Sequence, residues 1–260
     1  ASIAHDIDSQ SHRQRLHDVD ICLWQPSAIE DVEPADVVIE AFGCELSEYY
    51  VQRLALKRTP YVWINLEYLS AESWVPHYHG LSSPHPVLPL TKTFFFPGFL
   101  PGTGGLLRER HLISHRRSFD AESEHEFLRR HGFPVRTSAE IRVSLFCYET
   151  APVERLVQIL RESTVPVSLF VPEGNVALRI STFLGERVDH QEKLLRQGHL
   201  TVQIFPWLEQ AEYDRLLWSC DINIVRGEDS FVRAQWAAKP FVWTIYPQTE
   251  GAHWHKLDAF

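Results

Sequence analysis

The densest chemistry of the chain lies in residues 226–230, where a guanidinium, two carboxylates and a hydroxyl occur within one short stretch. An apolar run over 221–225 precedes it and an amphipathic run over 231–238 follows, so the sequence predicts a strand, a tight polar turn and a helix. The first turn of a helix has backbone N–H groups without intrahelical partners, and the helix dipole adds positive charge there. The turn is therefore predicted to hold an anion such as a phosphate.

Within this turn, the carboxylate of Glu228 would repel a phosphate, so we expect it to face neutral polar groups such as sugar hydroxyls. The Ser230 hydroxyl and the amides near Asp229 would face the anion instead. The alternative is that Asp229 or Ser230 only caps the helix. Capping would account for one polar residue but not for Arg226, Gly227 and Glu228 before it, so a ligand site is favoured.

Two other expected strand ends carry side chains suited to a nucleotide. Phe205, Pro206 and Trp207 would form a flat apolar wall for a base, and Gln210 would hydrogen-bond a pyrimidine edge. The alternative is that these three side chains simply pack in the protein core. Taken without the other strand ends, core packing would be the favoured interpretation. Tyr148 would place its phenol on a phosphate, or would be a buried tyrosine whose hydroxyl is satisfied inside the protein.

The first half of the chain predicts a β-α-β unit. Its strands are expected over 36–43 and 61–65, with a helix over 46–57 between them, and a separate short strand is expected over 19–24. This order implies a parallel sheet with a right-handed connection. Residues 66–118 are rich in aromatic residues, Pro and Gly and show no helical period, so a long functional loop region is expected there. A charged helix is expected over 120–131, followed by a linker at 134–138.

The second half alternates strands and helices, which predicts a doubly wound α/β domain. The expected strands are 141–146, 167–171, 200–204, 222–225 and 241–245. The expected helices are 152–163, 188–197, 210–219 and 231–238. Ligands of such sheets bind beyond the carboxyl ends of the strands, which is where the polar strand ends would meet.

Composition argues against several classes of function. A net charge of −9 without a block of Lys and Arg argues against nucleic-acid binding, and no apolar stretch reaches the roughly 20 residues of a membrane span. The 4 cysteines are far apart, as expected of buried thiols in a reducing cytoplasm, and the 14 histidines are scattered, so no metal site is predicted. The motifs G-x-G-x-x-G, G-x-x-x-x-G-K-[ST] and G-x-S-x-G do not occur, which removes the main support for dehydrogenases, P-loop NTPases and α/β-hydrolases. Gly102 to Gly105 is interpreted as a flexible loop rather than a phosphate cradle.

Several blocks of the sequence resemble a known family. These blocks are residues 65–72, 96–99, 226–235, 239–241 and 245–248. They resemble the EarP family of bacterial protein-arginine rhamnosyltransferases, which modify elongation factor P. The resemblance implies an α/β protein of GT-B architecture, in which two Rossmann-like domains face a cleft. Residues 1–137 would form the acceptor-side domain and residues 138–260 the nucleotide-sugar-binding domain.

The same resemblance implies a substrate pair and a set of site residues. The donor would be dTDP-β-L-rhamnose, the acceptor one arginine of elongation factor P, and the anomeric centre would be inverted. The implied donor-binding residues are Phe146, Tyr148, Trp207, Gln210, Ala211, Glu212, Arg226, Gly227, Glu228, Asp229, Ser230 and Tyr246. Phe146 and Trp207 would lie beside the thymine, and Glu228 is the essential glutamate of this half. No cofactor, metal, nucleic acid or membrane partner is expected, and the expected location is the cytoplasm.

Some features of the family do not occur in this sequence. The N-F-G-D-I-G loop that holds the proposed general base is absent, and the chain contains no Met. We therefore expect that both ends of the protein lie outside this sequence, with the general base in the N-terminal part. Asp18 and Asp20 are not assigned to catalysis. Thr244 stands where the family commonly has His.

Two other functions stay open. The first is another GT-B transferase or an epimerase that uses a different nucleotide sugar. The second is a nucleotide-sugar-binding protein without turnover. A preference for dTDP over UDP would distinguish the first, and a mass shift on elongation factor P would distinguish the second.

Overall fold

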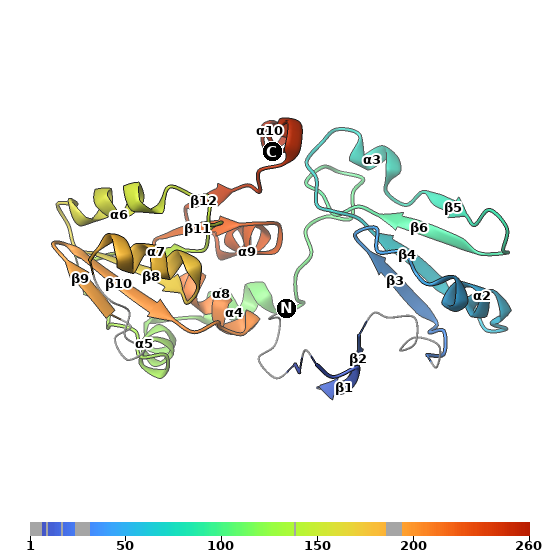
Figure 1. Cartoon of the computed structure of the whole chain (residues 1–260), viewed down its shortest axis with the longest axis horizontal. Helices are drawn as coiled ribbons and strands as arrows, with labels where there is room; N and C mark the ends of the chain where they lie inside the picture. The colour runs from blue at the N-terminus through green and yellow to red at the C-terminus, as the bar shows by residue number, and fades with distance from the viewer. Residues whose placement is uncertain (1–6, 9, 17, 24–31, 138, 186–193) are drawn as a thin grey trace. The chain divides into compact units, whose positions relative to one another are not determined.

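The structure is a computed structural model that describes residues 7–8, 10–16, 18–23, 32–137, 139–185 and 194–260 (Figure 1). The chain divides into two compact units, Ala1–Leu107 with Trp254–Phe260, and Arg108–His253. Both units contain parallel strands and helices, so the predicted α/β class is confirmed. The second unit begins before α4 (Leu112–Ser118) and α5 (Ala121–Arg130), which the sequence analysis placed in the first domain. The predicted domain division at 137 stays a prediction.

The first unit is built on a four-stranded sheet of order β3-β4-β6-β5. Its strands are β3 (Val37–Ala41), β4 (Val62–Leu66), β5 (Ser82–Pro84) and β6 (Thr91–Phe95). Strands β3, β4 and β6 are parallel to one another, whereas β5 runs antiparallel to β6. A separate hairpin joins β1 (Arg13–Leu16) to β2 (Val19–Cys22).

Helix α2 (Glu48–Leu56) connects β3 to β4, as the sequence predicted. It begins after Ser47, whose side chain accepts a hydrogen bond from the backbone N–H of Tyr50 and so satisfies one free donor of the first turn. Its apolar side packs on the sheet, where Leu54 belongs to a buried cluster with Val38 and Trp63. This packing gives the first unit its core.

The prediction of a long loop region over 66–118 was wrong in part. That region contains β5 and β6, the short helix α3 (Val75–Tyr78) and α4. The strand β6 has the sequence Thr-Lys-Thr-Phe-Phe. Its three polar residues interrupt the continuous apolar run by which a buried parallel strand is recognised. Within the glycine-rich stretch, Gly104 is closely packed, because a Cβ atom there would clash with the ring of Phe95.

The second unit is built on a six-stranded sheet of order β12-β11-β7-β8-β10-β9. Its strands are β7 (Ile141–Leu145), β8 (Val167–Pro172), β9 (Leu194–Gln197), β10 (Leu200–Phe205), β11 (Ile222–Arg226) and β12 (Phe241–Thr244). All pairs are parallel except β9 with β10.

Helices cover both faces of this sheet (Figure 1). They are α5, α6 (Val153–Arg161), α7 (Asn175–Phe183), α8 (Gln210–Ser219) and α9 (Asp229–Ala237). Successive strand residues point to opposite faces. Accordingly, Leu169 of β8 packs in one buried cluster with α6 and α7, while Phe170 packs in another with α5 and α8. The second unit therefore has the predicted doubly wound arrangement.

The strand order creates a switch point between β7 and β11. The chain adds β8 and β10 on one side of β7, then returns to add β11 and β12 on its other side. The loops that leave β7 and β11 therefore run in opposite directions and leave a crevice at the carboxyl ends of the two strands. Ligands of doubly wound sheets bind at this position.

One predicted element of the second unit was wrong. A helix was predicted over 188–197, but Leu194–Gln197 is β9, and residues 188–193 lie outside the described part. The positive φ of 58° at Gly198 reverses the chain and pairs β9 with β10 as a hairpin. The helix between β8 and β10 is instead α7, which the sequence analysis missed.

The chain ends with η1 (Thr249–Gly251) and α10 (Ala252–Ala259). Trp254–Phe260 belongs to the first unit, where the rings of Phe260 and Phe99 lie 5.1 Å apart between centroids. Across the part of the chain that is described, none of the helices has both the length and the apolar character required for a membrane crossing.

Candidate functional site

The side chain of Arg226 occupies the switch point between β7 and β11. Its guanidinium carbon lies 4.3 Å from the centroid of the Phe146 ring and 4.9 Å from that of Tyr148. It also donates a hydrogen bond of 3.4 Å to the backbone carbonyl of Cys147. A cation over the face of an aromatic ring is attracted by the ring's quadrupole. A fixed positive charge is thus held at the crevice before any ligand arrives.

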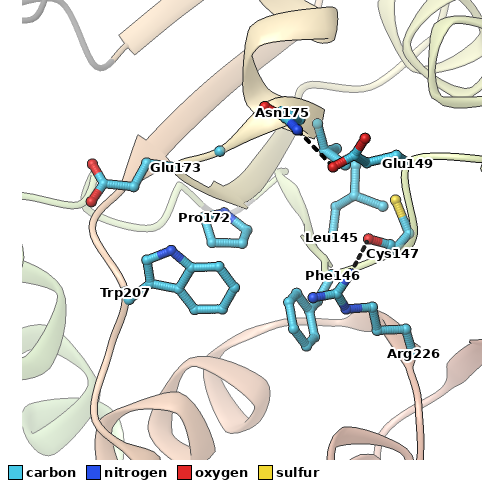
Figure 2. A pocket seen from close by; sticks show the side chains of 11 residues that line it. Leu145, Phe146, Cys147, Glu149, Pro172, Glu173, Asn175, Trp207 and Arg226 are labelled. Atoms are coloured by element: carbon cyan, nitrogen blue, oxygen red, sulfur yellow. Dashed lines mark hydrogen bonds between the residues drawn. The ribbon is translucent and has the colours of Figure 1, made fainter. Parts of the chain in front are cut away.

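A cavity of about 110 Å³ opens beside this cation (Figure 2). Figure 2 shows Arg226 next to Phe146, with Trp207 across from them. The Phe146 and Trp207 rings meet edge to face, with centroids 5.6 Å apart and an angle of 84° between their planes. The cavity therefore combines two aromatic walls with a cation, and the structure brings these three predicted residues together.

The turn after β11 is held in shape by contacts from β12 and β7. Gly227 has a φ of 63°, and a Cβ atom there would lie 3.4 Å from the hydroxyl of Tyr148. The indole N–H of Trp243 donates a 2.9 Å hydrogen bond to the Gly227 carbonyl. The same indole stacks on Phe231, with ring centroids 4.0 Å apart. Glycine is favoured at this position because it adopts such a φ at a lower cost than a residue with a Cβ atom.

Helix α9 starts immediately after this turn. Its N-cap residue is Glu228, whose side chain makes no capping hydrogen bond to the first turn. The hydroxyl of the buried Ser230 accepts a 3.1 Å hydrogen bond from the Arg226 N–H and donates one to the Arg226 carbonyl, so it closes the turn. The Asp229 carboxylate accepts a 3.2 Å hydrogen bond from Arg233. Asp229 and Ser230 are therefore the first two residues of α9 rather than its N-cap, and their role toward a ligand stays a prediction.

Two tyrosines stand beside the turn. The rings of Tyr148 and Tyr246 meet edge to face with centroids 5.2 Å apart, and Tyr246 is exposed. Burial raises the pKa of the Tyr148 phenol above its ordinary value, while the charge of Arg226 partly offsets this rise. The phenol therefore stays protonated at neutral pH and can donate a hydrogen bond to an anion.

The predicted residues at the start of α8 lie elsewhere. Gln210 and Ala211 line a second cavity of about 640 Å³ among α4, α5 and α8. Glu212 pairs with His131 at 2.9 Å and accepts a 2.6 Å hydrogen bond from Arg215. The structure therefore does not bring these three residues to the cavity beside Arg226, and their role in donor binding stays a prediction.

Sequence reasoning missed one side of the cavity. Glu149, Glu173 and Asn175 line it, and the Asn175 amide donates a 2.7 Å hydrogen bond to Glu149 (Figure 2). Asn175 is the first residue of α7, the helix that was not predicted, and Glu173 lies just before it. The available signal was the polar Glu-Gly-Asn stretch at 173–175, which directly follows the apolar run of β8.

Two further residues near the site have structural roles. Burial raises the pKa of the Cys147 thiol to about 11, so this cavity-lining side chain is a neutral thiol at physiological pH. The Thr244 hydroxyl donates a 2.8 Å hydrogen bond to the Val225 carbonyl and so reinforces the pairing of β12 with β11. Within the described ranges, no three or more His, Cys, Asp or Glu side chains gather to hold a metal ion.

Comparisons with known proteins identify relatives along the whole chain. Residues 1–260 match the family described as EarP, Elongation-Factor P (EF-P) rhamnosyltransferase. A protein-arginine rhamnosyltransferase of Pseudomonas putida is 48% identical over 255 residues, which cover 97% of this chain and 67% of the relative. One of Pseudomonas aeruginosa is 44% identical over 263 residues, which cover 100% of this chain and 69% of the relative.

A solved structure that concerns EarP-mediated arginine glycosylation of translation elongation factor EF-P is also similar. It is 43% identical, with a TM-score of 0.57, and the match covers 64% of this chain and 52% of that chain. The match thus spans about half the length of the solved chain, and the matches to the two Pseudomonas proteins span about two thirds of theirs.

Proposed function

The chain belongs to the EarP family of elongation factor P rhamnosyltransferases, and from this premise we propose that it transfers L-rhamnose from dTDP-β-L-rhamnose to an arginine of elongation factor P. In this proposal the two units are the domains of a GT-B glycosyltransferase, and the second unit binds the donor. The observation that carries it is the position of Arg226 between Phe146 and Tyr148 at the switch point of the second sheet.

The proposed donor pose follows from the chemistry of the crevice. The thymine would lie against Phe146 and Trp207, because flat apolar rings bind a base by stacking. The diphosphate would be held by Arg226, the Tyr148 phenol and the amides at the start of α9. This arrangement stabilises a leaving diphosphate by hydrogen bonds and a fixed cation.

The acceptor sets the remaining requirement. An arginine guanidinium has a pKa above about 12 and is therefore protonated and a poor nucleophile. A carboxylate that binds it in a bidentate manner can localise its charge and accept a proton late in the reaction. Inversion follows from a single in-line displacement at the anomeric carbon. In this proposal Glu228 positions the donor, and the general base comes from the family's N-F-G-D-I-G segment, which does not occur in this sequence.

Two measurements test the proposal. Thermal unfolding with dTDP or UDP should show a larger rise of the melting temperature with dTDP, because a ligand that binds only the folded state stabilises it. Incubation of a protein that also carries the N-terminal family segment with dTDP-β-L-rhamnose and elongation factor P should add one deoxyhexosyl group to an arginine. Stabilisation by UDP alone would favour another nucleotide-sugar enzyme, whereas binding of dTDP without any mass shift would favour a binding protein.

The role of Glu228 has its own test. In a protein that also carries the N-terminal family segment, Glu228→Gln keeps the size of the side chain and removes its charge, so turnover should fall while the protein stays folded. Full turnover together with tight donor binding in this variant would contradict the assignment.

A further inference from the structure

Arg233, on the second turn of α9, is bound by three carboxylates from three different segments. It donates two hydrogen bonds to Asp214 of α8, at 3.1 and 2.8 Å, and one of 2.7 Å to Glu109 at the start of the second unit. Its Nε donates the 3.2 Å hydrogen bond to Asp229. Only 11% of the Arg233 side chain is exposed, so the guanidinium is fixed by these bonds.

Asp229 is the member of this group that lies closest to the proposed ligand along the chain. It is the first residue of α9, at the helix end where the diphosphate is proposed to bind, and 71% of its side chain is exposed. A carboxylate at this position would repel a diphosphate. The hydrogen bond to Arg233 draws the Asp229 side chain along the helix toward the following turn and offsets its charge.

Asp214 and Glu109 hold the guanidinium of Arg233 in position. Asp214 is buried, and both of its carboxylate oxygens accept hydrogen bonds from Nη1 of Arg233, which restricts the position of that nitrogen. Because Asp214 belongs to α8, the contact also sets the turn relative to the Trp207 segment that leads into this helix. Glu109 closes the remaining side of the fork.

We propose that Arg233 is the positioning residue of the phosphate-binding turn, which holds Asp229 away from the diphosphate and neutralises its charge. This inference rests on the proposed function, because it takes a nucleoside diphosphate as the ligand of the turn. Arg233 does not itself touch the ligand in this assignment. Its effect should therefore depend on how many negative charges the ligand carries.

The test is a titration series with thymidine, dTMP and dTDP against the unsubstituted chain and Arg233→Met. Loss of the guanidinium should weaken dTDP binding by about tenfold or more, dTMP binding by less, and thymidine binding by no more than about twofold. The loss should shrink in 1 M salt, because the Asp229 carboxylate is exposed and its charge is screened. If Arg233→Met does not fold, Arg233→Lys takes its place. This variant keeps the positive charge but not the planar guanidinium with its several N–H donors, so its loss of dTDP affinity should be intermediate.

A double variant separates the electrostatic role from a structural one. Adding Asp229→Asn to Arg233→Met removes the uncompensated charge of Asp229, the carboxylate at the helix start, so most of the lost dTDP affinity should return. Arg136→Met is the matched control, because Arg136 also pairs with two carboxylates in the second unit, those of Glu124 and Asp221. It should affect all three ligands equally and weakly.

The outcomes decide between the possible roles. Equal loss for thymidine, dTMP and dTDP in Arg233→Met, without recovery in the double variant, would show a structural role and overturn the inference while leaving the proposed function intact. A lack of dTDP binding by the unsubstituted chain would overturn the proposed function, and the inference with it.

Discussion

The guanidinium carbon of Arg226 lies 4.3 Å from the centroid of the Phe146 ring, although the two residues are far apart in the chain. Arg226 ends β11 and Phe146 directly follows β7, and these two strands pair in parallel, with Ile224 opposite Leu145. The pairing therefore brings the cation and the ring to the same end of the sheet. Because the cation is already fixed, a ligand would lose less free energy in ordering it.

Removing this cation should abolish most of the nucleotide affinity. Arg226→Met leaves Phe146 and Tyr148 without the guanidinium between them and removes the charge proposed to face the diphosphate. The affinity for dTDP should fall by about tenfold to a hundredfold, since charge-assisted hydrogen bonds contribute about 1.5–3 kcal/mol each. Calorimetric titration measures this loss. Arg161→Met, which removes a hydrogen bond to Gln197 in the same unit, is the control and should bind normally. Unchanged affinity in Arg226→Met would contradict the assignment of the site.

Gly227→Ala should damage both stability and binding. A left-handed φ costs a residue with a Cβ about 1–2 kcal/mol, and the new Cβ would also touch the Tyr148 hydroxyl at 3.4 Å. Gly185→Ala is the matched control, because Gly185 has a φ of 74° with no atom within 4 Å of the added Cβ. Both variants should show similar losses in chemical denaturation, but only Gly227→Ala should also lose dTDP affinity. Equal affinity in the two variants would show that the shape of the turn does not matter for the ligand.

Asp214 should make stability depend on pH in the acidic range. Burial raises its pKa from 3.8 to about 6, although Arg233 partly offsets the rise. The folded state thus binds a proton more readily than the unfolded chain, so this contribution is present below about pH 4 and is lost as the pH rises to about 6. The variant Asp214→Asn has no carboxyl group at this position, so its stability should lack this contribution to the pH dependence.

Denaturation of both proteins between pH 4 and 8 measures this contribution. The free energy of unfolding of the unsubstituted chain, relative to Asp214→Asn, should fall between about pH 4 and 6 and stay constant above pH 7. A difference that is constant over the whole range would mean that Asp214 keeps an ordinary pKa in the folded state.

The cysteines should differ strongly in reactivity. Cys147 lines the cavity but burial raises its pKa to about 11, so very little thiolate is present at pH 7.5. Cys44 is exposed. Alkylation followed by mass spectrometry should label Cys44 about tenfold or more faster than Cys147. Addition of dTDP should slow Cys147 further without changing Cys44. Rapid labelling of Cys147 in the folded chain would contradict its burial.

Many elements of the second unit could be predicted because their local signals are strong. The helix over 210–219 has the predicted bounds, and the apolar runs at 141–146, 167–171, 200–204 and 222–225 are all strands. Buried parallel strands are apolar on both faces, which makes them easy to recognise. The errors include the polar strand β6 and the short edge strand β9, where this signal is weak, and helix α7, which was not predicted.

The site was predictable in part for the same reason. The polar turn at 226–230, the alternation of strands and helices, and the resemblance to a family all follow from local patterns of residues. Which of those residues share one cavity depends on how the whole second unit folds. Strand order places Arg226, Phe146 and Trp207 together, whereas Gln210 and Ala211 line a different cavity and Glu212 is engaged with His131. The physical reason is that pairing between distant strands, and the direction in which each helix leaves the sheet, depend on packing across the whole domain and leave no local pattern.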